Sequence, residues 1–296
     1  MPNIHRIALP VRSYECDFYG HVNQVNYLRY MQEAAIGASA AVGYGETRYQ
    51  QLGTIWFIRE LEIEYFSPLK MGDTVHIATW VGDFRRVRSR RFYEMTRAAD
   101  NAPVAKANVD WIYLDRETET PIQVPEEMAA AFVPDDAERV QTVARRPKFP
   151  EAPPIPNGAF TMKRRVEWRD IDSAQHVNNA NYLAFMEEAS VEATAARDWP
   201  FQRIQSHGFG IMARKHHIEY RLQAALGEEL TVTTYLAEPR RSTVTRIYLI
   251  HRVSDQALIA QSRSQFMCVN LEHGTLMRFP EGFVRDFTDS FAENSP

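Results

Sequence analysis

One segment of this 296-residue sequence occurs twice, and this repeat restricts the fold more than any other feature. HVNQVNYLRYMQEAA begins at residue 21 and HVNNANYLAFMEEAS begins at residue 176, and an aspartate precedes each segment by four residues. These aspartates, Asp17 and Asp172, are 155 residues apart, and the same offset pairs identical residues without a gap along the rest of each copy. Self-similarity of this length indicates a duplicated domain rather than a short solenoid repeat.

The chain length and the proline content between the copies predict the domain boundaries. A chain of 296 residues is long enough for two domains of about 150 residues, each with its own core. Residues 144–158 contain five prolines, which favour an extended and semi-rigid connection. We therefore expect an N-terminal domain at residues 1–133, a proline-rich linker at residues 134–158 and a C-terminal domain at residues 159–296.

The same order of elements is predicted in each copy. A short strand leads into the aspartate-containing turn, and a helix follows on which apolar and small residues recur at helical spacing. Four longer segments with strand character come next, separated by turn signals. A long helix against an antiparallel sheet of five strands is an α+β architecture. The expected long strands lie at residues 55–66, 74–81, 89–98 and 105–114, and at residues 211–222, 230–237, 243–253 and 260–269.

Charge, hydropathy and cysteine content exclude several classes of protein. A net charge of −4 argues against nucleic acid or an anionic membrane as the main partner. Because no apolar run approaches the roughly 20 residues that span a bilayer, we expect a soluble, cytoplasmic protein. Cys16 and Cys268 form no disulfide framework, and neither they nor the histidines have a zinc-binding spacing. We therefore expect no metal and no cofactor.

The two repeated motifs also resemble a known family. VRSYECDFYGHVNQVNYLRYMQEA and WRDIDSAQHVNNANYLAFMEEA resemble hotdog thioesterases of the 4-hydroxybenzoyl-CoA thioesterase type. The second motif is also similar to the acyl-carrier-protein thioesterases of plants and bacteria, whose chains hold two hotdogs. The resemblance implies a tandem hotdog, in which a five-stranded antiparallel sheet wraps a long central helix in each half and the halves pair as a pseudo-dimer.

One departure from the acyl-carrier-protein enzymes leaves the type of carrier open. Those enzymes typically keep an asparagine two residues after the aspartate, whereas this sequence has Tyr19 and Ala174 at these positions. The substrate is therefore expected to be a thioester of coenzyme A or of an acyl carrier protein, without a preference for either.

The repeated polar residues suit the hydrolysis of an acyl thioester. This reaction needs an activated water or a nucleophile, together with a group that stabilises the oxyanion. Because the sequence lacks the Gly-x-Ser-x-Gly elbow of α/β hydrolases, a carboxylate is the expected activator. Asp17 and Asp172 lie just before a helix start, where backbone N–H groups and the helix dipole polarise a carbonyl oxygen. Helix capping is the structural alternative for both aspartates.

The resemblance implies further roles around each aspartate. The aspartate acts as base or nucleophile, and the oxyanion donor is the backbone N–H seven residues later, which belongs to Gln24 or Asn179. His21 and His176 either tune the aspartate and shuttle a proton or bind backbone at a turn, and both alternatives stay open. Asn23 and Asn178 are expected to cap the helices.

Four arginines are weaker candidates for substrate binding. Arg85, Arg86, Arg240 and Arg241 occupy matching positions of the repeat, where they suit the phosphates of coenzyme A or an acidic carrier protein. A solvated strand face is the more frequent explanation for such residues.

We therefore expect an acyl thioester hydrolase with a competent site in each half. One alternative is a hotdog hydratase or dehydratase acting on enoyl- or hydroxyacyl-CoA, although the Asn-Pro pair usual between its Asp and His is absent. The other is a non-catalytic acyl-CoA-binding module. Acyl chain length and assembly into a homo-oligomer stay open at this stage.

Overall fold

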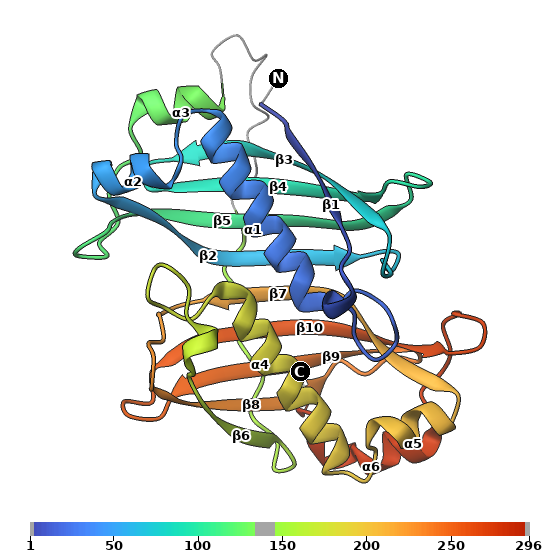
Figure 1. The fold of residues 1–296 in the computed structure, drawn as a ribbon. Coiled ribbons are helices and arrows are strands. Elements are labelled where there is room, and N and C mark those ends of the chain that lie inside the picture. Colours follow the sequence, from blue (N-terminus) through green and yellow to red (C-terminus); the bar gives the residue numbers. More distant parts are fainter. Residues whose placement is uncertain (1–2, 134–145, 294–296) are drawn as a thin grey trace. The chain divides into compact units, whose positions relative to one another are not determined.

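The computed structural model describes residues 3–133 and 146–293, which form two compact units, Met1–Lys148 and Phe149–Pro296. Each unit contains one long helix and five strands (Figure 1). The N-terminal unit comprises β1 (His5–Pro10), the 3-10 helix η1 (Ser13–Glu15), α1 (Gln24–Ala41), α2 (Glu46–Leu52), β2 (Thr54–Tyr65), β3 (Thr74–Arg85), β4 (Arg88–Arg97), β5 (Pro103–Asp115) and α3 (Glu126–Phe132).

The C-terminal unit repeats this order of elements. It comprises β6 (Phe160–Arg165), η2 (Trp168–Asp170), α4 (Asn179–Ala195), α5 (Phe201–Ser206), β7 (Phe209–Tyr220), β8 (Glu229–Ala237), β9 (Thr243–Arg252), β10 (Leu258–Asn270), α6 (Glu281–Asp286) and η3 (Thr288–Ser290).

The strands of each unit form one antiparallel sheet with the same connectivity. The order is β1-β3-β4-β5-β2 in the N-terminal unit and β6-β8-β9-β10-β7 in the C-terminal unit. The long helix, α1 or α4, lies across one face of the sheet of its own unit (Figure 1). This arrangement confirms the α+β prediction of a central helix wrapped by a five-stranded sheet in each half.

The short elements differ from the sequence prediction. The first strand of each copy was expected at residues 5–13 and 160–168. It ends earlier, at Pro10 and Arg165, because the chain turns there into a 3-10 helix. The six- and seven-residue helices α2, α3, α5 and α6 were not predicted. Helices this short owe their stability to packing rather than to local propensity, and they span too few turns for a periodic pattern.

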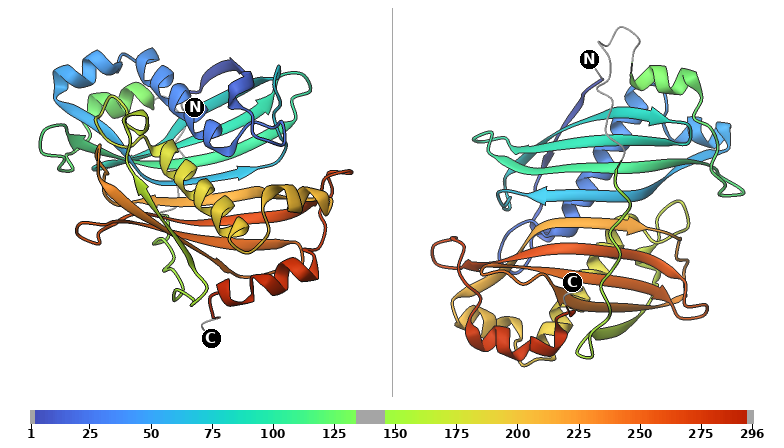
Figure 2. Two further views of the ribbon diagram at one scale, coloured as in Figure 1. Left: turned by 60° about the horizontal axis from the view of Figure 1, so that its bottom comes forward. Right: turned by 180° about the vertical axis from the view of Figure 1, so that it is seen from behind.

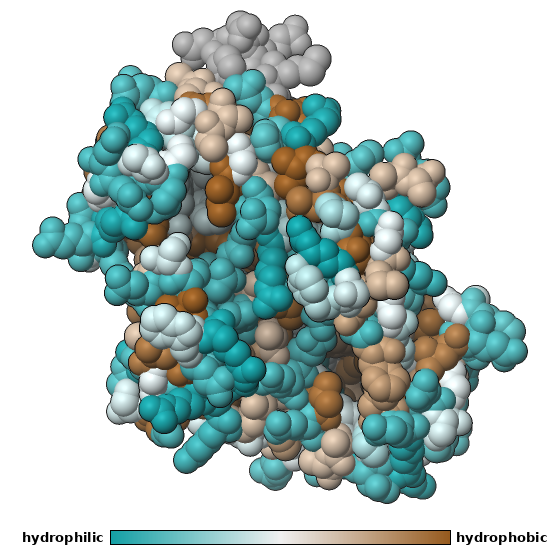
Figure 3. Space-filling model, in the orientation of Figure 1, coloured by the Kyte–Doolittle hydropathy of each residue, from teal (hydrophilic) through white to brown (hydrophobic). Residues whose placement is uncertain are grey.

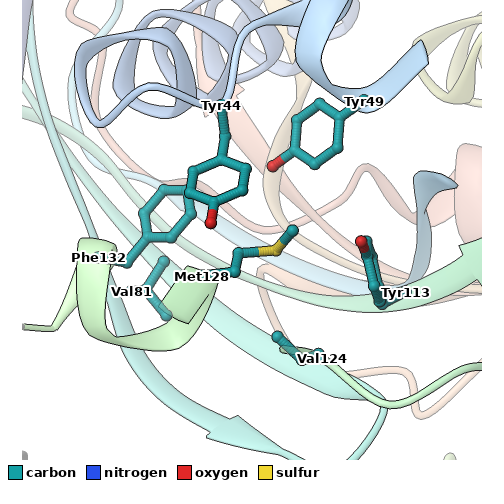
Figure 4. Packing of buried hydrophobic residues seen from close by; sticks show 7 residues of the cluster. All are labelled: Tyr44, Tyr49, Val81, Tyr113, Val124, Met128 and Phe132. Atoms are coloured by element: carbon teal, nitrogen blue, oxygen red, sulfur yellow. The ribbon is translucent and has the colours of Figure 1, made fainter. Parts of the chain in front are cut away.

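An aromatic cluster packs these short helices against each sheet. In the N-terminal unit, Figure 4 shows the ring of Tyr44 beside that of Phe132. The side chain of Met128 lies close to Tyr44 and Tyr49. The C-terminal cluster uses the matching positions of the repeat, among them Phe283 and Phe287, whose rings stack at 4.6 Å. The duplicated register therefore extends into the core. The N-terminal cluster consists of Tyr44, Tyr49, Val81, Tyr113, Val124, Met128 and Phe132.

Part of the expected linker belongs to the C-terminal unit. Residues 149–158 run along the face of the C-terminal sheet that is turned away from α4 (Figure 2). The ring of Phe149 lies 4.4 Å from that of His217, and the hydroxyl of Tyr235 donates to the carbonyl of Pro153 at 2.6 Å. Residues 134–145 of the expected linker lie outside the described residues.

Most of the surface visible in Figure 3 is hydrophilic, and apolar residues form small separate patches on it. Exposed apolar side chains include Ile36 on α1 and Val191 on α4. Within the described residues, no helix combines the length and the apolar character needed to cross a membrane.

The C-terminal aromatic cluster gives a test of this packing. Phe287 is 2% exposed, so we expect Phe287→Ala to lower the free energy of unfolding by about 3–5 kcal/mol, because it removes buried contacts and leaves a cavity. Urea unfolding monitored by circular dichroism measures this loss. The control Val191→Ala, at a residue 58% exposed, should change stability by no more than about 0.5 kcal/mol.

Candidate active site at the start of each central helix

A tight loop places the aspartate of each repeat next to the start of the central helix. The backbone N–H of Asp17 donates to the carbonyl of His21 at 2.7 Å, and the N–H of Gly20 donates to the carbonyl of Asp17 at 3.0 Å. Gly20 has a φ of +74°, a left-handed conformation that glycine adopts without steric cost. The loop therefore closes on itself before α1 begins.

The second copy builds the same loop with different side chains. The N–H of Asp172 donates to the carbonyl of His176 at 3.0 Å, and the N–H of Gln175 donates to the carbonyl of Asp172 at 2.9 Å. Gln175 takes the position of Gly20 and keeps the left-handed conformation, with a φ of +66°. A non-glycine residue in this conformation is uncommon, so the hydrogen bonds of the loop, rather than local preference, determine its shape.

Backbone amides hold the carboxylate of each aspartate. Oδ1 of Asp17 accepts hydrogen bonds from the N–H of Tyr19 at 2.8 Å and of His21 at 3.3 Å. Oδ1 of Asp172 accepts from the N–H of Ala174 at 2.9 Å. Tyr19 and Ala174 thus contribute a backbone N–H, which every residue type except proline supplies.

The second carboxylate oxygen differs between the two copies. Oδ2 of Asp172 accepts a hydrogen bond from Nδ2 of Asn178 at 3.2 Å. Oδ2 of Asp17 makes no hydrogen bond within the described residues, and Asp17 is half-buried. The N-terminal copy therefore leaves one carboxylate oxygen available to a water molecule or a substrate.

Burial perturbs the acid and the imidazole of the N-terminal copy in opposite directions. Partial burial raises the pKa of Asp17, against the lowering effect of the N–H groups of His21 and Tyr19. Burial also lowers the pKa of His21; the charge of Asp17 opposes this change and the charge of Lys70 adds to it. The shift of Asp17 strengthens the carboxylate as a proton acceptor, and the shift of His21 favours the neutral imidazole.

The asparagines of the motif cap the central helices. Oδ1 of Asn23 accepts from the N–H of Val25 at 2.9 Å, and Oδ1 of Asn178 accepts from the N–H of Ala180 at 3.0 Å. The helices begin at the next residues, Gln24 and Asn179, whose amides were the expected oxyanion donors. The N–H of Asn179 donates to no acceptor within the described residues, as is usual for the first residue of a helix.

A half-buried tyrosine, Tyr65, and a buried one, Tyr220, support the helix starts, and sequence reasoning did not assign them this role. The hydroxyl of Tyr65 donates to the carbonyl of Gln24 at 3.3 Å, and that of Tyr220 donates to the carbonyl of Asn179 at 3.1 Å. Both tyrosines end an Ile-Glu-Tyr sequence that the repeat conserves. That identity was the available signal, but the contact spans 41 residues and becomes visible only in the folded chain.

The four candidate arginines are exposed on hairpin connections. Arg85 ends β3, where its Nε pairs with Asp83 at 2.8 Å, and Arg86 lies in the turn that follows. His21 bridges to Lys70, near the other end of β3. At about 3.3 Å per residue, the twelve residues of β3 place Thr74 and Arg85 about 36 Å apart, so the structure does not bring these two arginines to Asp17. Arg240 and Arg241 lie in the matching connection between β8 and β9.

Comparison with known proteins identifies the family of this chain. The model of the thioesterase-like superfamily matches residues 11–132 and again residues 166–287, two ranges separated by the same offset of 155 residues. The chain belongs to the thioesterase-like superfamily.

Relatives of known activity share parts of the sequence. A chloroplastic acyl-[acyl-carrier-protein] hydrolase of Cuphea viscosissima is 24% identical over 199 residues, which cover 63% of this chain and 47% of the relative. The long-chain acyl-CoA thioesterase FadM of Escherichia coli K12 is 30% identical over 108 residues, covering 36% of this chain and 81% of FadM. The chain thus spans about half the length of the plant relative.

Solved structures share the fold of the chain. The 12:0-ACP thioesterase of Umbellularia californica matches with a TM-score of 0.70 at 17% identity, over 90% of this chain and 94% of that one. An acyl-ACP thioesterase of Bacteroides thetaiotaomicron matches with a TM-score of 0.68 at 15% identity, over 89% and 97% of the two chains. At these identities the likeness concerns the fold alone.

The raised pKa of Asp17 predicts a pH-dependent effect of Asp17→Asn on stability. Burial disfavours the carboxylate, so ionised Asp17 destabilises the folded chain at neutral pH. Asparagine keeps the Oδ1 acceptor without the charge. Asp17→Asn should therefore stabilise the protein at pH 7, and this gain should shrink as the pH falls through the raised pKa toward the ordinary aspartate value of about 3.9. Thermal unfolding from pH 7 to pH 4 measures it, and a gain that grew on acidification would contradict the prediction.

Proposed function

We propose that this protein hydrolyses acyl thioesters, with an aspartate at the start of each central helix as the activating base. Membership of the thioesterase-like superfamily supports this function. The observation that carries the proposal is the repeated arrangement of a half-buried aspartate, held by backbone amides, beside the capped start of the long helix.

The proposed chemistry follows from this geometry. A water molecule near Oδ2 of Asp17 loses a proton to the carboxylate as its oxygen bonds to the thioester carbon. The carbonyl oxygen becomes an oxyanion, which the first backbone N–H of α1 or α4 and the positive end of the helix dipole stabilise. The C–S bond then breaks, and the proton returns through the aspartate or the neutral imidazole of His21 to the thiolate. The products are a carboxylic acid and a free thiol.

The half-buried setting of Asp17 suits a base. A raised pKa increases the affinity of the carboxylate for the proton of water, which makes it a stronger general base. The buried thiol of Cys268 does not suit a nucleophile, because burial raises its pKa to about 11. Cys268 instead packs in the aromatic cluster of the C-terminal unit.

Coenzyme A and acyl carrier protein are both proposed as the thiol carrier. FadM is named for acyl-CoA and the Cuphea enzyme for acyl-[acyl-carrier-protein], and the chain is similar to both. We place Gln24 and Asn179 as oxyanion donors, His21 and His176 as proton carriers and Asn23 and Asn178 as caps. The proposed role of Arg85, Arg86, Arg240 and Arg241 is limited to contacts with the carrier.

Removal of the two carboxylates tests the proposal. Asp17→Asn and Asp172→Asn should each abolish turnover in their own half, and the double variant should release free thiol about 10² to 10⁴ times more slowly than wild type, the usual range for a lost general base. The release of thiol from a series of acyl-CoA substrates is followed with a chromogenic thiol reagent. Enoyl-CoA hydration is assayed in parallel for the hydratase alternative.

A matched pair of surface aspartates provides the control. Asp100 and Asp255 are also 155 residues apart and lie exposed in hairpin turns. The Asp100→Asn, Asp255→Asn double variant should keep wild-type activity. Thiol release that persisted at the wild-type rate in the Asp17→Asn, Asp172→Asn variant would overturn the proposed function.

A further inference from the structure

The side chains between the long helix and the sheet differ in polarity between the two units. In the C-terminal unit this inner layer is identified by two contacts. The hydroxyl of Tyr248 on β9 hydrogen-bonds to the hydroxyl of Ser190 on α4, and Tyr220 on β7 bonds to the carbonyl of Asn179. Because side chains alternate along a strand, every second residue from these tyrosines also faces α4.

Strand pairing places four residues of this inner layer side by side. His216 on β7 pairs with Ser264 on β10, Ser264 pairs with Arg246 on β9, and Arg246 pairs with Leu236 on β8. In the N-terminal unit, the same row at the same offset consists of Leu61, Val109, Arg91 and Val81.

Four positions of the inner layer are apolar in the N-terminal unit and polar in the C-terminal unit. Leu61, Val109, Ala107 and Ala35 are replaced by His216, Ser264, Ser262 and Ser190, respectively. The polar residues form a buried hydrogen-bonded chain: Nδ1 of His216 lies 2.8 Å from Oγ of Ser264, which lies 2.9 Å from Oγ of Ser262. Buried polar side chains cost free energy unless they are paired, so these groups do not stabilise the core as apolar side chains would. Their presence indicates a role other than apolar packing.

The imidazole in this chain is neutral and brings no charge of its own. Burial lowers the pKa of His216 to about 3, so the ring is unprotonated at neutral pH. The cation of this layer is therefore Arg246.

Arg246 is a buried cation without a carboxylate partner among the described residues. It is 7% exposed, and its one hydrogen bond there joins Nη1 to Oγ1 of Thr234 at 3.5 Å. Burial lowers its pKa, and the nearby guanidinium of Arg197 lowers it further. Nε and Nη2 make no hydrogen bond within the described residues, yet neither atom is fully enclosed by protein. Both nitrogens therefore keep a small area that a water molecule can touch, and neither is saturated by hydrogen bonds within the described residues.

The matching arginine of the N-terminal unit, Arg91, is equally buried and donates to the matching Thr79 at 3.4 Å, but it also contacts an aromatic ring. The guanidinium of Arg91 lies over the ring of Phe132, 5.5 Å from its centroid, where the ring electrons stabilise the cation. Over the described part of the chain, no ring covers Arg246 in this way; its neighbour Arg197 is the cation that lies over Phe287. A buried guanidinium without an anion is costly, and a ligand carboxylate removes that cost.

We propose that the C-terminal unit binds an acyl group that ends in a carboxylate, and that this carboxylate pairs with Arg246. The substrate class is the monothioester of a dicarboxylic acid, whereas the N-terminal unit, in which Phe132 covers the matching Arg91, receives an uncharged chain. The inference rests on the proposed hydrolase function, because it concerns the acyl part of the same substrate.

The geometry of β7 sets the length of this acyl group. Tyr220 contacts the helix start, and His216, in the row of Arg246, lies four residues away along the strand. At about 3.3 Å per residue the two rows are about 13 Å apart. Arg246 also lies two strands away from β7, about 9.5 Å to the side at about 4.8 Å per strand, so an acyl chain about 16 Å long places its thioester near Asp172 and its carboxylate near Arg246.

The test uses the full-length Asp17→Asn variant, in which the C-terminal site works alone. Thiol release is measured for ω-carboxyacyl-CoA substrates of increasing length and for unsubstituted acyl-CoA substrates of equal length. We expect the ratio of kcat/KM to favour the carboxylated substrate by about tenfold to a hundredfold at the length that spans the two rows, the size of a charge-assisted pair. Arg246→Met should abolish this preference, and Arg91→Met in the same background should leave it intact.

A second variant and a binding measurement separate this inference from the proposed function. His216→Leu with Ser264→Val installs the residues of the N-terminal row, and it should weaken the preference for the carboxylated substrate even where Arg246→Met folds poorly. The ω-carboxyalkyl thioether of coenzyme A, which is not hydrolysed, should bind more tightly than the alkyl thioether in calorimetry.

The outcomes are distinct. Hydrolysis without a preference for the carboxylate, or a preference that survives Arg246→Met, overturns this inference and leaves the proposed function standing. Release of thiol from no substrate overturns the proposed function. Tighter binding of the ω-carboxyalkyl thioether, lost in Arg246→Met, would then still support the carboxylate site.

Discussion

A single backbone carbonyl holds the start of each central helix, and the geometry of the candidate site depends on it. The carbonyl of Glu15 accepts hydrogen bonds from the backbone N–H of Asn23 at 2.9 Å and from Nδ2 of Asn26 at 2.8 Å. The carbonyl of Asp170 accepts the same two bonds in the second copy. Because the aspartate loop lies between this carbonyl and the cap, the two bonds fix the position of the aspartate relative to the first turn of the helix.

Both copies keep these two hydrogen bonds to the carbonyl of Glu15 or Asp170, but the side-chain carboxylates of these two residues have different partners. The carboxylate of Glu15 accepts hydrogen bonds from the hydroxyl of Tyr30 at 2.6 Å and from Arg12. Burial raises the pKa of Glu15, but these hydrogen bonds lower it by more, so the pKa is lowered overall. Asp170 instead pairs with Arg164 at 3.3 Å. Duplication thus kept the backbone geometry of the helix start and let the side chains around it diverge. Between the long helix and the sheet the side chains diverged further, since four positions that are apolar in the N-terminal unit are polar in the C-terminal unit.

Local features were predictable from the sequence, whereas contacts between distant residues were not. The aspartate loop, the caps Asn23 and Asn178 and the helix starts lie within a few residues of each other, so a short motif encodes them. The support of Asn179 by Tyr220 and the pairing of His216 with Ser264 depend on strand register over 41 and 48 residues. The sequence showed that the residues repeat, but only the paired strands show that they touch.

The burial of Arg246 links the stability of the chain to its ligand. The guanidinium of Arg246 loses its hydration on folding and gains only a long hydrogen bond to Thr234. In the absence of a ligand, this loss destabilises the folded protein. Any anion that binds Arg246 in the folded chain, and not in the unfolded one, lowers this penalty in proportion to its own concentration. The lifetime of such a protein against proteolysis would therefore rise and fall with the supply of the molecule it consumes.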